Sequence, residues 1–263
     1  MYKTLIIQGY AEYICRKIAH LIPITPYQKS DVSKKDQVTN MFDKIATKYD
    51  FLNSFLSLGI DSLWRKKAIS LIVDKPQTLQ ILDVATGTAS LAIEAAKKFP
   101  QHEITGIDLS ENMLEKGQLR IHKLKLTSSI NLLKGDSESL PFQNEIFDVV
   151  MVAFGVRNFE HLEVGLQEMS RVLKPGGQMI ILEFSKPTFF PFKQLFQLYF
   201  KNILPFIGKV FSKDQRAYKY LFESVQQFPD YERFTAIMNS VNIKNATILP
   251  LTLGICCVYS GTK

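Results

Sequence analysis

Hydrophobic and polar positions change their spacing near residue 78 of the chain. Before that point apolar residues recur every three or four positions, which predicts helices over residues 38–49 and 62–73. After it, short continuous apolar runs alternate with segments of helical spacing, as buried strands and their connecting helices do. The predicted strands are residues 79–85, 103–108, 130–134, 147–153 and 178–184, and the predicted helices are residues 90–98, a helix opening at residue 110, and residues 164–173.

Strands without internal polar alternation need cover on both faces, which a parallel sheet between two layers of helices supplies. Right-handed crossovers then give a doubly wound sheet. A helix after Asp230 precedes two short strands, residues 246–249 and 255–260, which we expect to pair antiparallel at the sheet edge. The predicted fold class is therefore α/β, with a mostly parallel, seven-stranded, Rossmann-like sheet, extra N-terminal helices and an aromatic-rich helical insertion.

Residues 1–36 are expected to form an extension and linker in front of one domain of residues 37–263. Apolar residues at helical spacing fill residues 1–27, and Pro23 and Pro26 end that pattern. A helix packed on the main domain and an interfacial helix that touches lipid explain the pattern equally well.

The predicted helical insertion, residues 189–228, has an unusual composition. Its first part, residues 189–211, holds seven phenylalanines and two prolines, and its apolar positions follow helical spacing. Packing against the sheet is one explanation. The aromatic density is higher than packing requires, so we favour the wall or lid of an apolar substrate pocket.

Composition places the chain among ordinary globular proteins. Of its 263 residues, 46% are hydrophobic and 22% are charged, and no apolar run reaches the roughly 18 residues of a membrane-spanning helix. The three cysteines, Cys15, Cys256 and Cys257, form no CxxC pair. This argues against a disulfide framework or a zinc finger and favours a reducing, cytoplasmic compartment. No metal site is expected.

The net charge of +7 is spread thinly along the chain. Lysines occur singly or in pairs between acidic residues, which is typical of solvated helix faces, so we expect no nucleic-acid partner. A weak attraction to an anionic membrane surface is a second use of the same charge.

The first candidate for chemistry is the turn at Gly87, directly after the first predicted strand. Ligands of doubly wound sheets bind at the carboxyl ends of the strands, where glycine lets the backbone approach them. Asp108 ends the second predicted strand about 20 residues later, where an acid hydrogen-bonds a ribose. Ser110 is available as the helix N-cap, which leaves Asp108 for the ligand. Together these residues predict a nucleoside-containing ligand.

The dinucleotide pattern G-x-G-x-x-G is poorly matched, because Gly87, Ala89 and Ala92 occupy its three glycine positions. The third predicted strand is followed by Asp136 and Ser137, whose oxygens suit an exocyclic amine and ring nitrogens. This arrangement favours adenosine without a pyrophosphate.

Several ordered motifs now point to a family. The segments ILDVATGT (81–88), GID (106–108), GDS (135–137) and LKPGG (173–177) resemble those of S-adenosylmethionine-dependent class I methyltransferases. More specifically, the chain resembles the ubiquinone/menaquinone C-methyltransferase family. The matching segments run from about residue 38 to residue 263: MFD (41–43), KYD (48–50), SLGI (57–60), WR (64–65), FGVRN (154–158), LEFSKP (182–187) and YKYL (218–221).

The resemblance implies S-adenosylmethionine as the cofactor and a set of residues to hold it. Gly87 and Thr88 would hold the methionine part, Asp108 the ribose, and Asp136 with Ser137 the adenine. Three residues of the predicted N-terminal helices would close this pocket: Tyr49, Trp64 and Arg65.

The chain departs from the family pattern at Ala89 and Ser90, where a glycine and an acid are usual. A methyl group at Ala89 is expected to crowd the cofactor if that residue needs a positive φ. The missing acid would have paired with the ammonium group of the cofactor, and Asp83 is the nearby substitute.

The implied activity is methylation of a ring carbon of a prenylated quinol, with demethylmenaquinol favoured over a ubiquinone-type 2-polyprenyl-6-methoxy-benzoquinol. Arg157 and Asn158, just past the fourth predicted strand, would face the ring as catalytic residues. An arginine stabilises phenolate over phenol, and a water held by both residues would take the proton.

Two other functions are weighed against this one. Methylation of a nucleic-acid base is disfavoured, because the Asn/Asp-Pro-Pro-aromatic motif of the amino-methylating DNA enzymes is missing at residues 154–158. A non-catalytic scaffold of quinone biosynthesis is suggested by Ala89 and Ser90. The prenylated substrate favours peripheral membrane contact, and a homodimer is one option for the oligomeric state.

Overall fold

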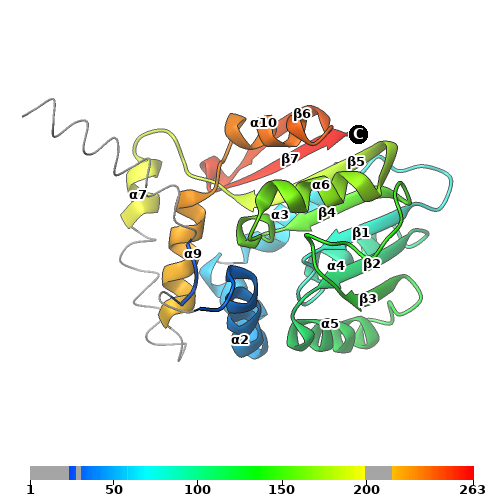
Figure 1. Cartoon of the computed structure of the whole chain (residues 1–263), viewed down its shortest axis with the longest axis horizontal. Coiled ribbons are helices and arrows are strands. Elements are labelled where there is room, and N and C mark those ends of the chain that lie inside the picture. The colour runs from blue at the N-terminus through cyan, green and yellow to red at the C-terminus, as the bar shows by residue number, and fades with distance from the viewer. Residues whose placement is uncertain (1–23, 28–30, 58, 199–214) are drawn as a thin grey trace, which may run out of the picture.

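The computed structural model describes residues 24–27, 31–57, 59–198 and 215–263 (Figure 1). The side chains of residues 47–56, 215 and 218 are outside this description. Most of the predicted N-terminal helix and residues 199–214 of the predicted insertion therefore lie outside the described residues.

The described part of the chain forms one seven-stranded sheet in the order β3-β2-β1-β4-β5-β7-β6. The first five strands pair in parallel, and β7 runs antiparallel to both β5 and β6. The predicted doubly wound, mostly parallel sheet is confirmed, with β6 at its antiparallel edge. The strands are β1 (Gln80–Val84), β2 (Glu103–Asp108), β3 (Ile130–Lys134), β4 (Phe147–Ala153), β5 (Leu173–Phe184), β6 (Lys244–Leu251) and β7 (Cys256–Thr262).

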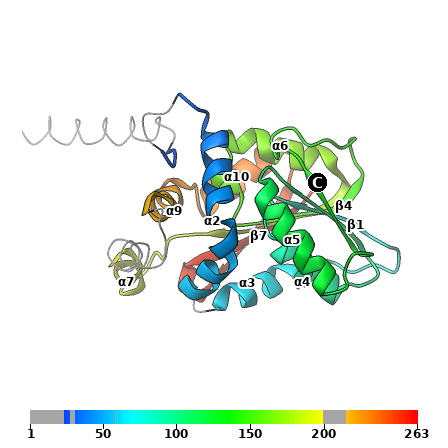
Figure 2. The same cartoon turned by 90° about the horizontal axis from the view of Figure 1, so that it is seen from below.

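Helices cover both faces of the sheet because successive strand residues point to opposite sides. Figure 2 shows α3 and α4 on one side of the sheet and α6 on the other. Ile81 packs into one core cluster together with side chains of α3, α4 and α5, whereas Leu82 packs into a second cluster with side chains of α6 and α10. The helices are α2 (Lys34–Leu56), α3 (Ile60–Ile69), α4 (Ser90–Lys98), α5 (Glu111–Lys123), α6 (Leu162–Val172), α7 (Phe192–Leu198), α9 (Gln215–Gln227) and α10 (Glu232–Ser240), with 3-10 turns η1 (Val156–Asn158) and η3 (Thr252–Gly254).

Several boundaries differ from the sequence prediction, among them the starts of α2 and β5. Helix α2 begins at Lys34, so residues 34–36 belong to the helix, not to the linker. The strand predicted over residues 178–184 starts earlier, because β5 already begins at Leu173. The reason is backbone pairing: the N–H of Gly176 donates to the carbonyl of Lys263, and the N–H of Lys263 donates to the carbonyl of Gly177.

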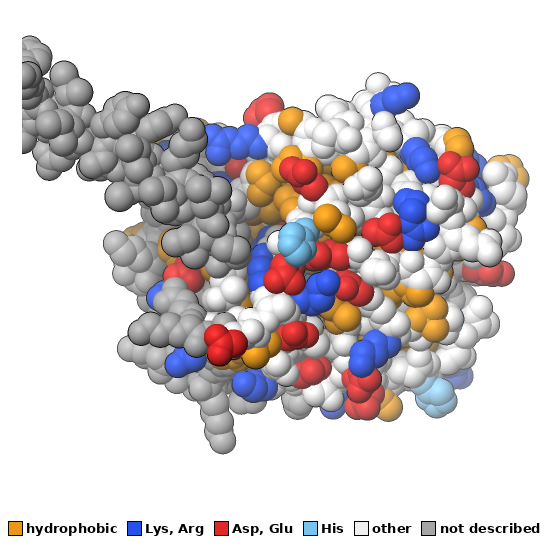
Figure 3. Space-filling model, viewed as in Figure 1, with side chains coloured by type: hydrophobic (Ala, Val, Ile, Leu, Met, Phe, Trp, Pro, Cys, Tyr) orange, Lys and Arg blue, Asp and Glu red, His pale blue; other side chains and the backbone are white. Residues whose placement is uncertain are grey.

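The surface agrees with the diffuse charge of the sequence. On the face seen in Figure 3, Lys and Arg side chains are interspersed with Asp and Glu. Among the described residues, no helix combines the length and the hydropathy that a bilayer crossing needs. The same residues contain no cluster of three or more His, Cys, Asp or Glu side chains placed to hold a metal ion.

Candidate active site

Two pockets lie side by side at the carboxyl ends of β1 to β4, the edge where a doubly wound sheet binds its ligands. The first encloses about 730 Å³ and the second about 830 Å³, each counted with the open space at its mouth. They share four lining residues, Ala85, Gly87, Ala153 and Phe154. The pockets therefore meet at the turn after β1 and together suit one elongated ligand.

Gly87 forms the floor where the two pockets meet. Its φ is +55°, and a Cβ built at this position would meet no atom within 4 Å, so the space above the backbone is open. The N–H of Gly87 donates to Oδ2 of Asp108 over 2.8 Å, which ties the turn after β1 to the end of β2. A ligand can thus approach the backbone of this turn closely.

Asp108 lines the first pocket, as the ribose role requires. Its Oδ1 accepts a hydrogen bond from the N–H of Ser110 over 2.9 Å. Burial raises the pKa of Asp108, and the N–H groups of Ser110, Gly87 and Leu109 oppose that rise. Ser110 is the N-cap of α5, as predicted, and its side chain accepts from the N–H of Met113. The side chain of Asp108 is therefore not needed as the helix cap and can face a ligand.

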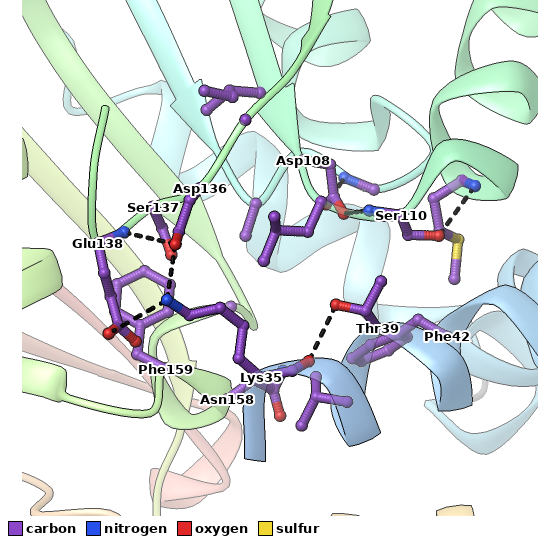
Figure 4. A pocket seen from close by; sticks show the side chains of 18 of the residues that line it. Lys35, Thr39, Phe42, Asp108, Ser110, Asp136, Ser137, Glu138, Asn158 and Phe159 are labelled. Carbon is purple, nitrogen blue, oxygen red and sulfur yellow. Dashed lines mark hydrogen bonds and ion pairs between the residues drawn. The ribbon is translucent and has the colours of Figure 1, made fainter. Parts of the chain in front are cut away.

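The far end of the first pocket holds Asp136 and Ser137, the pair assigned to the adenine (Figure 4). Lys35 of α2 reaches across to them: its Nζ lies 2.6 Å from Oδ2 of Asp136 and 3.7 Å from Oε2 of Glu138. Burial opposes the charge of Lys35, but these carboxylates raise its pKa overall. Sequence reasoning missed Lys35, because the polar segment around it lacks any period that would place it on a helix.

The second pocket contains the predicted Arg65, Asp83 and Thr88. Oδ2 of Asp83 accepts from Oγ1 of Thr86 over 2.6 Å and from the N–H of Ala92 over 3.2 Å. Oδ1 of Asp83 is buried and has no hydrogen-bond partner among the described residues. Burial raises the pKa of Asp83 to about 7, although both donors oppose it. This carboxyl is therefore poised to ionise when a cation arrives.

Arg120 of α5 also lines the second pocket and was missed by sequence reasoning. Its Nη1 donates to the carbonyl of Thr88 over 2.8 Å, to Oγ1 of Thr88 over 2.9 Å and to Oγ of Ser90 over 2.8 Å. Arg65 lies on α3 and pairs with Asp61 over 2.7 Å. Helical spacing in the sequence does not reveal that the side chain of Arg120 contacts Ser90, which lies 30 residues earlier.

The expected crowding by Ala89 is not seen. Its φ is indeed positive, at 61°, but the methyl group lines neither pocket. Ala89 is fully buried in the core, on the side of Gly117 in α5. The methyl therefore points away from the ligand space, and the substitution costs only the left-handed backbone conformation, about 1 kcal/mol.

The two residues expected at the substrate ring lie on η1, directly after β4. Asn158 lines the first pocket, and its Nδ2 donates to the carbonyl of Phe154 over 3.3 Å. Arg157 lines neither described pocket. Its Nη1 donates to the same carbonyl and to Oε1 of Glu183, the latter over 2.8 Å, and its guanidinium lies over the ring of Phe184.

Glu183 was part of a recognised motif but had been given no role. Its side chain is fully buried, and burial raises its pKa while the charge of Arg157 opposes that rise. A buried carboxylate with one guanidinium partner fixes that partner firmly, because breaking the pair would leave an uncompensated charge. Glu183 therefore orients Arg157.

Two residues expected to close the pocket remain. Tyr49 lies in α2, and its side chain is outside what the structure describes. Trp64 is buried in the core and lines neither described pocket; its Nε1 donates to Oγ1 of Thr252 over 2.7 Å. Its indole packs against Phe154, which does line both pockets.

The combined space fits an adenosyl amino acid. Asp108, Asp136 and Ser137 supply acceptors beside apolar walls in the first pocket. The second pocket offers Asp83 for an ammonium group, and Arg65 and Arg120 bring positive charge for a carboxylate. No phosphate-binding glycine pattern is present, in agreement with a ligand that lacks a pyrophosphate.

Comparison with solved structures supports the fold. Phosphoethanolamine N-methyltransferase 2 of Haemonchus contortus, solved with S-adenosylmethionine, matches 90% of this chain and 61% of its own with a TM-score of 0.63 and 17% identity. A methyltransferase of Thermotoga maritima that depends on the same cofactor matches 85% of this chain and 98% of its own, with a TM-score of 0.61 and 18% identity.

Closer relatives come from sequence comparison. A demethylmenaquinone methyltransferase of Bacteroides fragilis is 44% identical over 241 residues, which cover 91% of this chain and 97% of that protein. A ubiquinone/menaquinone biosynthesis C-methyltransferase of Geotalea daltonii is 47% identical over 231 residues, or 88% and 97% of the two chains. The family profile described as the ubiE/COQ5 methyltransferase family matches residues 30–263. The chain therefore belongs to the ubiE/COQ5 methyltransferase family.

Proposed function

We propose that this methyltransferase transfers a methyl group from S-adenosylmethionine to a ring carbon of a prenylated quinol, with demethylmenaquinol as its preferred acceptor. The observation that carries the proposal is the pair of joined pockets, which suits an adenosyl amino acid and has Asn158 in its wall. The names and coverage of the relatives favour a quinol as the acceptor and demethylmenaquinol in particular.

The cofactor's position follows from the polar groups that line the pockets. Asp108 receives the ribose hydroxyls, and Asp136 with Ser137 receives the adenine, after Lys35 has given up part of its contact with Asp136. Oδ1 of Asp83 faces the ammonium group. Tyr49, Arg65, Gly87 and Thr88 complete the enclosure of the methionine part.

When bound, S-adenosylmethionine supplies an electrophilic methyl group on a sulfonium. The protein's task is to make the ring carbon nucleophilic and to align it, which can contribute several kcal/mol. Arg157, held by Glu183, favours the ionised form of the quinol hydroxyl beside the reacting carbon. Oδ1 of Asn158 is buried without a partner among the described residues. It is therefore available to hold a water that takes the proton of the quinol hydroxyl.

The prenyl tail requires an apolar surface, and α7 offers one. Phe196 anchors this helix by packing near Val225. Four apolar side chains on α7 and the preceding turn are exposed: Phe189, Phe190, Leu195 and Leu198. We include in the proposal that this surface contacts the membrane in which a prenylated quinol resides.

The proposed reaction is tested directly with purified protein, methyl-labelled S-adenosylmethionine and a reduced quinone in detergent. We expect label in the product from demethylmenaquinol, and a smaller kcat/KM for the methoxy-benzoquinol. Equal or higher turnover of the benzoquinol would reverse the substrate order. Absence of label from both quinols, with the cofactor bound normally in calorimetry, would leave only the scaffold role.

Arg157→Lys tests the role of the guanidinium. Lysine keeps the charge but lacks the planar guanidinium whose Nη1 donates both to the carbonyl of Phe154 and to Oε1 of Glu183. We expect kcat to fall about 10²-fold, as on loss of one oriented donor, with an unchanged Kd for the cofactor. Arg171→Lys is the matched control, since Arg171 also pairs with a glutamate but lies on α6 and bonds to residues 140–144 instead of η1. Full kcat in Arg157→Lys would exclude the proposed role.

Asp83 gives cofactor binding a pH dependence. In the cofactor-free protein its pKa is about 7, so at about pH 6 the carboxyl is mostly protonated. Contact with the ammonium group favours the ionised form, so binding should release close to one proton at about pH 6 and progressively less as the pH rises to about 7.5. Affinity should therefore rise between about pH 6 and about pH 7.5, and fall again where the amino group of the cofactor loses its own proton, at about pH 8 and above.

Calorimetry in buffers of different ionisation enthalpy measures the number of protons that cofactor binding releases. In Asp83→Asn the release should vanish and affinity should fall at all pH values. Asp148→Asn is the control, because Asp148 lies at the amino end of β4, away from both pockets. This variant should behave like the wild type. Proton release that persists in Asp83→Asn would assign the titration to another group.

Membrane contact is tested by flotation with anionic phospholipid vesicles. Replacing two exposed apolar residues, Phe190→Ser with Leu195→Ser, should lower the vesicle-bound fraction about ten-fold, because each side chain contributes a few kcal/mol when fully buried in lipid. Leu119→Ser is the matched control, since Leu119 is 66% exposed but lies on α5. Unchanged flotation of the double variant would contradict contact through α7.

A further inference from the structure

Helix α9 places a tyrosine hydroxyl in the protein interior without a hydrogen-bond partner. Tyr220 is 2% exposed, and its hydroxyl has no partner among the described residues. Buried polar groups are almost always paired, because an unpaired one keeps its full desolvation cost. Tyr220 also belongs to the motif at residues 218–221 that the sequence singled out and to which no role has yet been given.

The surroundings of Tyr220 put it behind the wall of the first pocket. It packs with Val38 and Met41 of α2, and Phe42 packs against the same group. Val38 and Phe42 both line the first pocket. Helix α9 also packs against η1, the turn that carries Arg157 and Asn158. The helix that carries Tyr220 thus contacts both α2, which contributes to the wall of the first pocket, and η1, which carries Arg157 and Asn158.

The electrostatic setting keeps the hydroxyl a donor. Burial raises the pKa of Tyr220, and the charges of Arg157 and Glu183 act on it in opposite directions. The phenol is therefore neutral at physiological pH and retains its proton. The turn η1, against which α9 packs, carries two more polar atoms that are buried without partners among the described residues: Nε of Arg157 and Oδ1 of Asn158.

The packed pair of α9 and η1 therefore carries three unpaired buried atoms: two donors, Tyr220 O–H and Arg157 Nε–H, and one acceptor, Asn158 Oδ1. A ligand hydroxyl has one lone pair for each of the two donors, and its proton can pass to the water held by Oδ1 of Asn158. The structural groups of a folded core satisfy one another, whereas a binding site leaves such groups for its ligand.

We propose that Tyr220 is a substrate-binding residue whose hydroxyl donates a hydrogen bond to the quinol oxygen beside the methylated ring carbon. The proposal rests on the proposed function and extends it to a residue outside Arg157 and Asn158. As that oxygen ionises, the bond from Tyr220 becomes charge-assisted and strengthens. Tyr220 thus favours the reactive form of the quinol while keeping its own proton.

Tyr220→Phe removes only the hydroxyl. We expect kcat/KM for demethylmenaquinol to fall about ten-fold and the acid limb of the kcat profile to move to higher pH, because the quinol loses a donor that favours its ionised form. The Kd for S-adenosylmethionine should stay within two-fold of the wild type, a range of about 0.4 kcal/mol. The melting temperature of the free protein should rise by about 2–4 °C, because a desolvated, unpaired group is removed.

Tyr259→Phe is the matched control. Tyr259 is also buried, but its hydroxyl accepts a hydrogen bond from the N–H of Tyr231 over 2.9 Å. The same chemical change there should lower the melting temperature and leave kcat/KM and the pH profile as in the wild type. The two variants therefore predict opposite signs in stability, and a loss of activity in Tyr220→Phe only.

The outcomes distinguish the role of Tyr220 from the proposed function itself. An active wild type with unchanged kcat/KM and pH profile in Tyr220→Phe would overturn the role of Tyr220 and leave the proposed function standing. A lowered melting temperature in Tyr220→Phe would show a structural partner for the hydroxyl and also overturn it. A wild type that methylates no quinol would refute the proposed function, and the inference would fall with it.

Discussion

The hydrogen bond between the Asp108 carboxylate and the N–H of Gly87 is the interaction on which the site depends. Two parallel strands, β1 and β2, end side by side, and the chain must leave each of them without burying unpaired backbone groups. Asp108 solves this for both strands, since it also accepts from the N–H of Ser110 at the start of α5. The group that organises these strand ends is the same group that lines the cofactor pocket, so closure of the fold prepares ligand binding.

Unpaired polar groups and three residues of positive φ lie together at the carboxyl ends of these strands. Ala85, Ala89 and Phe154 adopt positive φ values at or near the ends of β1 and β4, a conformation that costs alanine about 1 kcal/mol. Asp83 and Asn158 carry buried atoms without partners among the described residues. The core clusters below are apolar and closely packed. Such a distribution is typical of a site whose missing partners are those of its ligands.

The sequence predicted the sheet well because buried parallel strands are continuous apolar runs with polar ends. The bounds of β2, β3, β4 and α4 were predicted correctly, and the pocket brings together Gly87, Asp108, Asp136 and Ser137 as expected. Contacts between distant segments left no such trace. Lys35 lies in a polar stretch without a helical period. Glu183 lies in β5 between the apolar residues 179–182 and Phe184. Their roles follow from tertiary packing alone.

Helix α2 couples the two halves of the site through adjacent lysines. Nζ of Lys35 lies 2.6 Å from Asp136 on the cofactor side, whereas Nζ of Lys34 donates to the carbonyl of Phe159 over 2.6 Å, just after η1. Burial lowers the pKa of Lys34, so this contact is made by a charge with few water neighbours. A cofactor that engages Asp136 must rearrange Lys35, and the same helix turn is anchored beside Arg157. One short stretch of α2 thus contacts both the Asp136 end of the first pocket and the residue after η1, although its polar sequence resembles a linker.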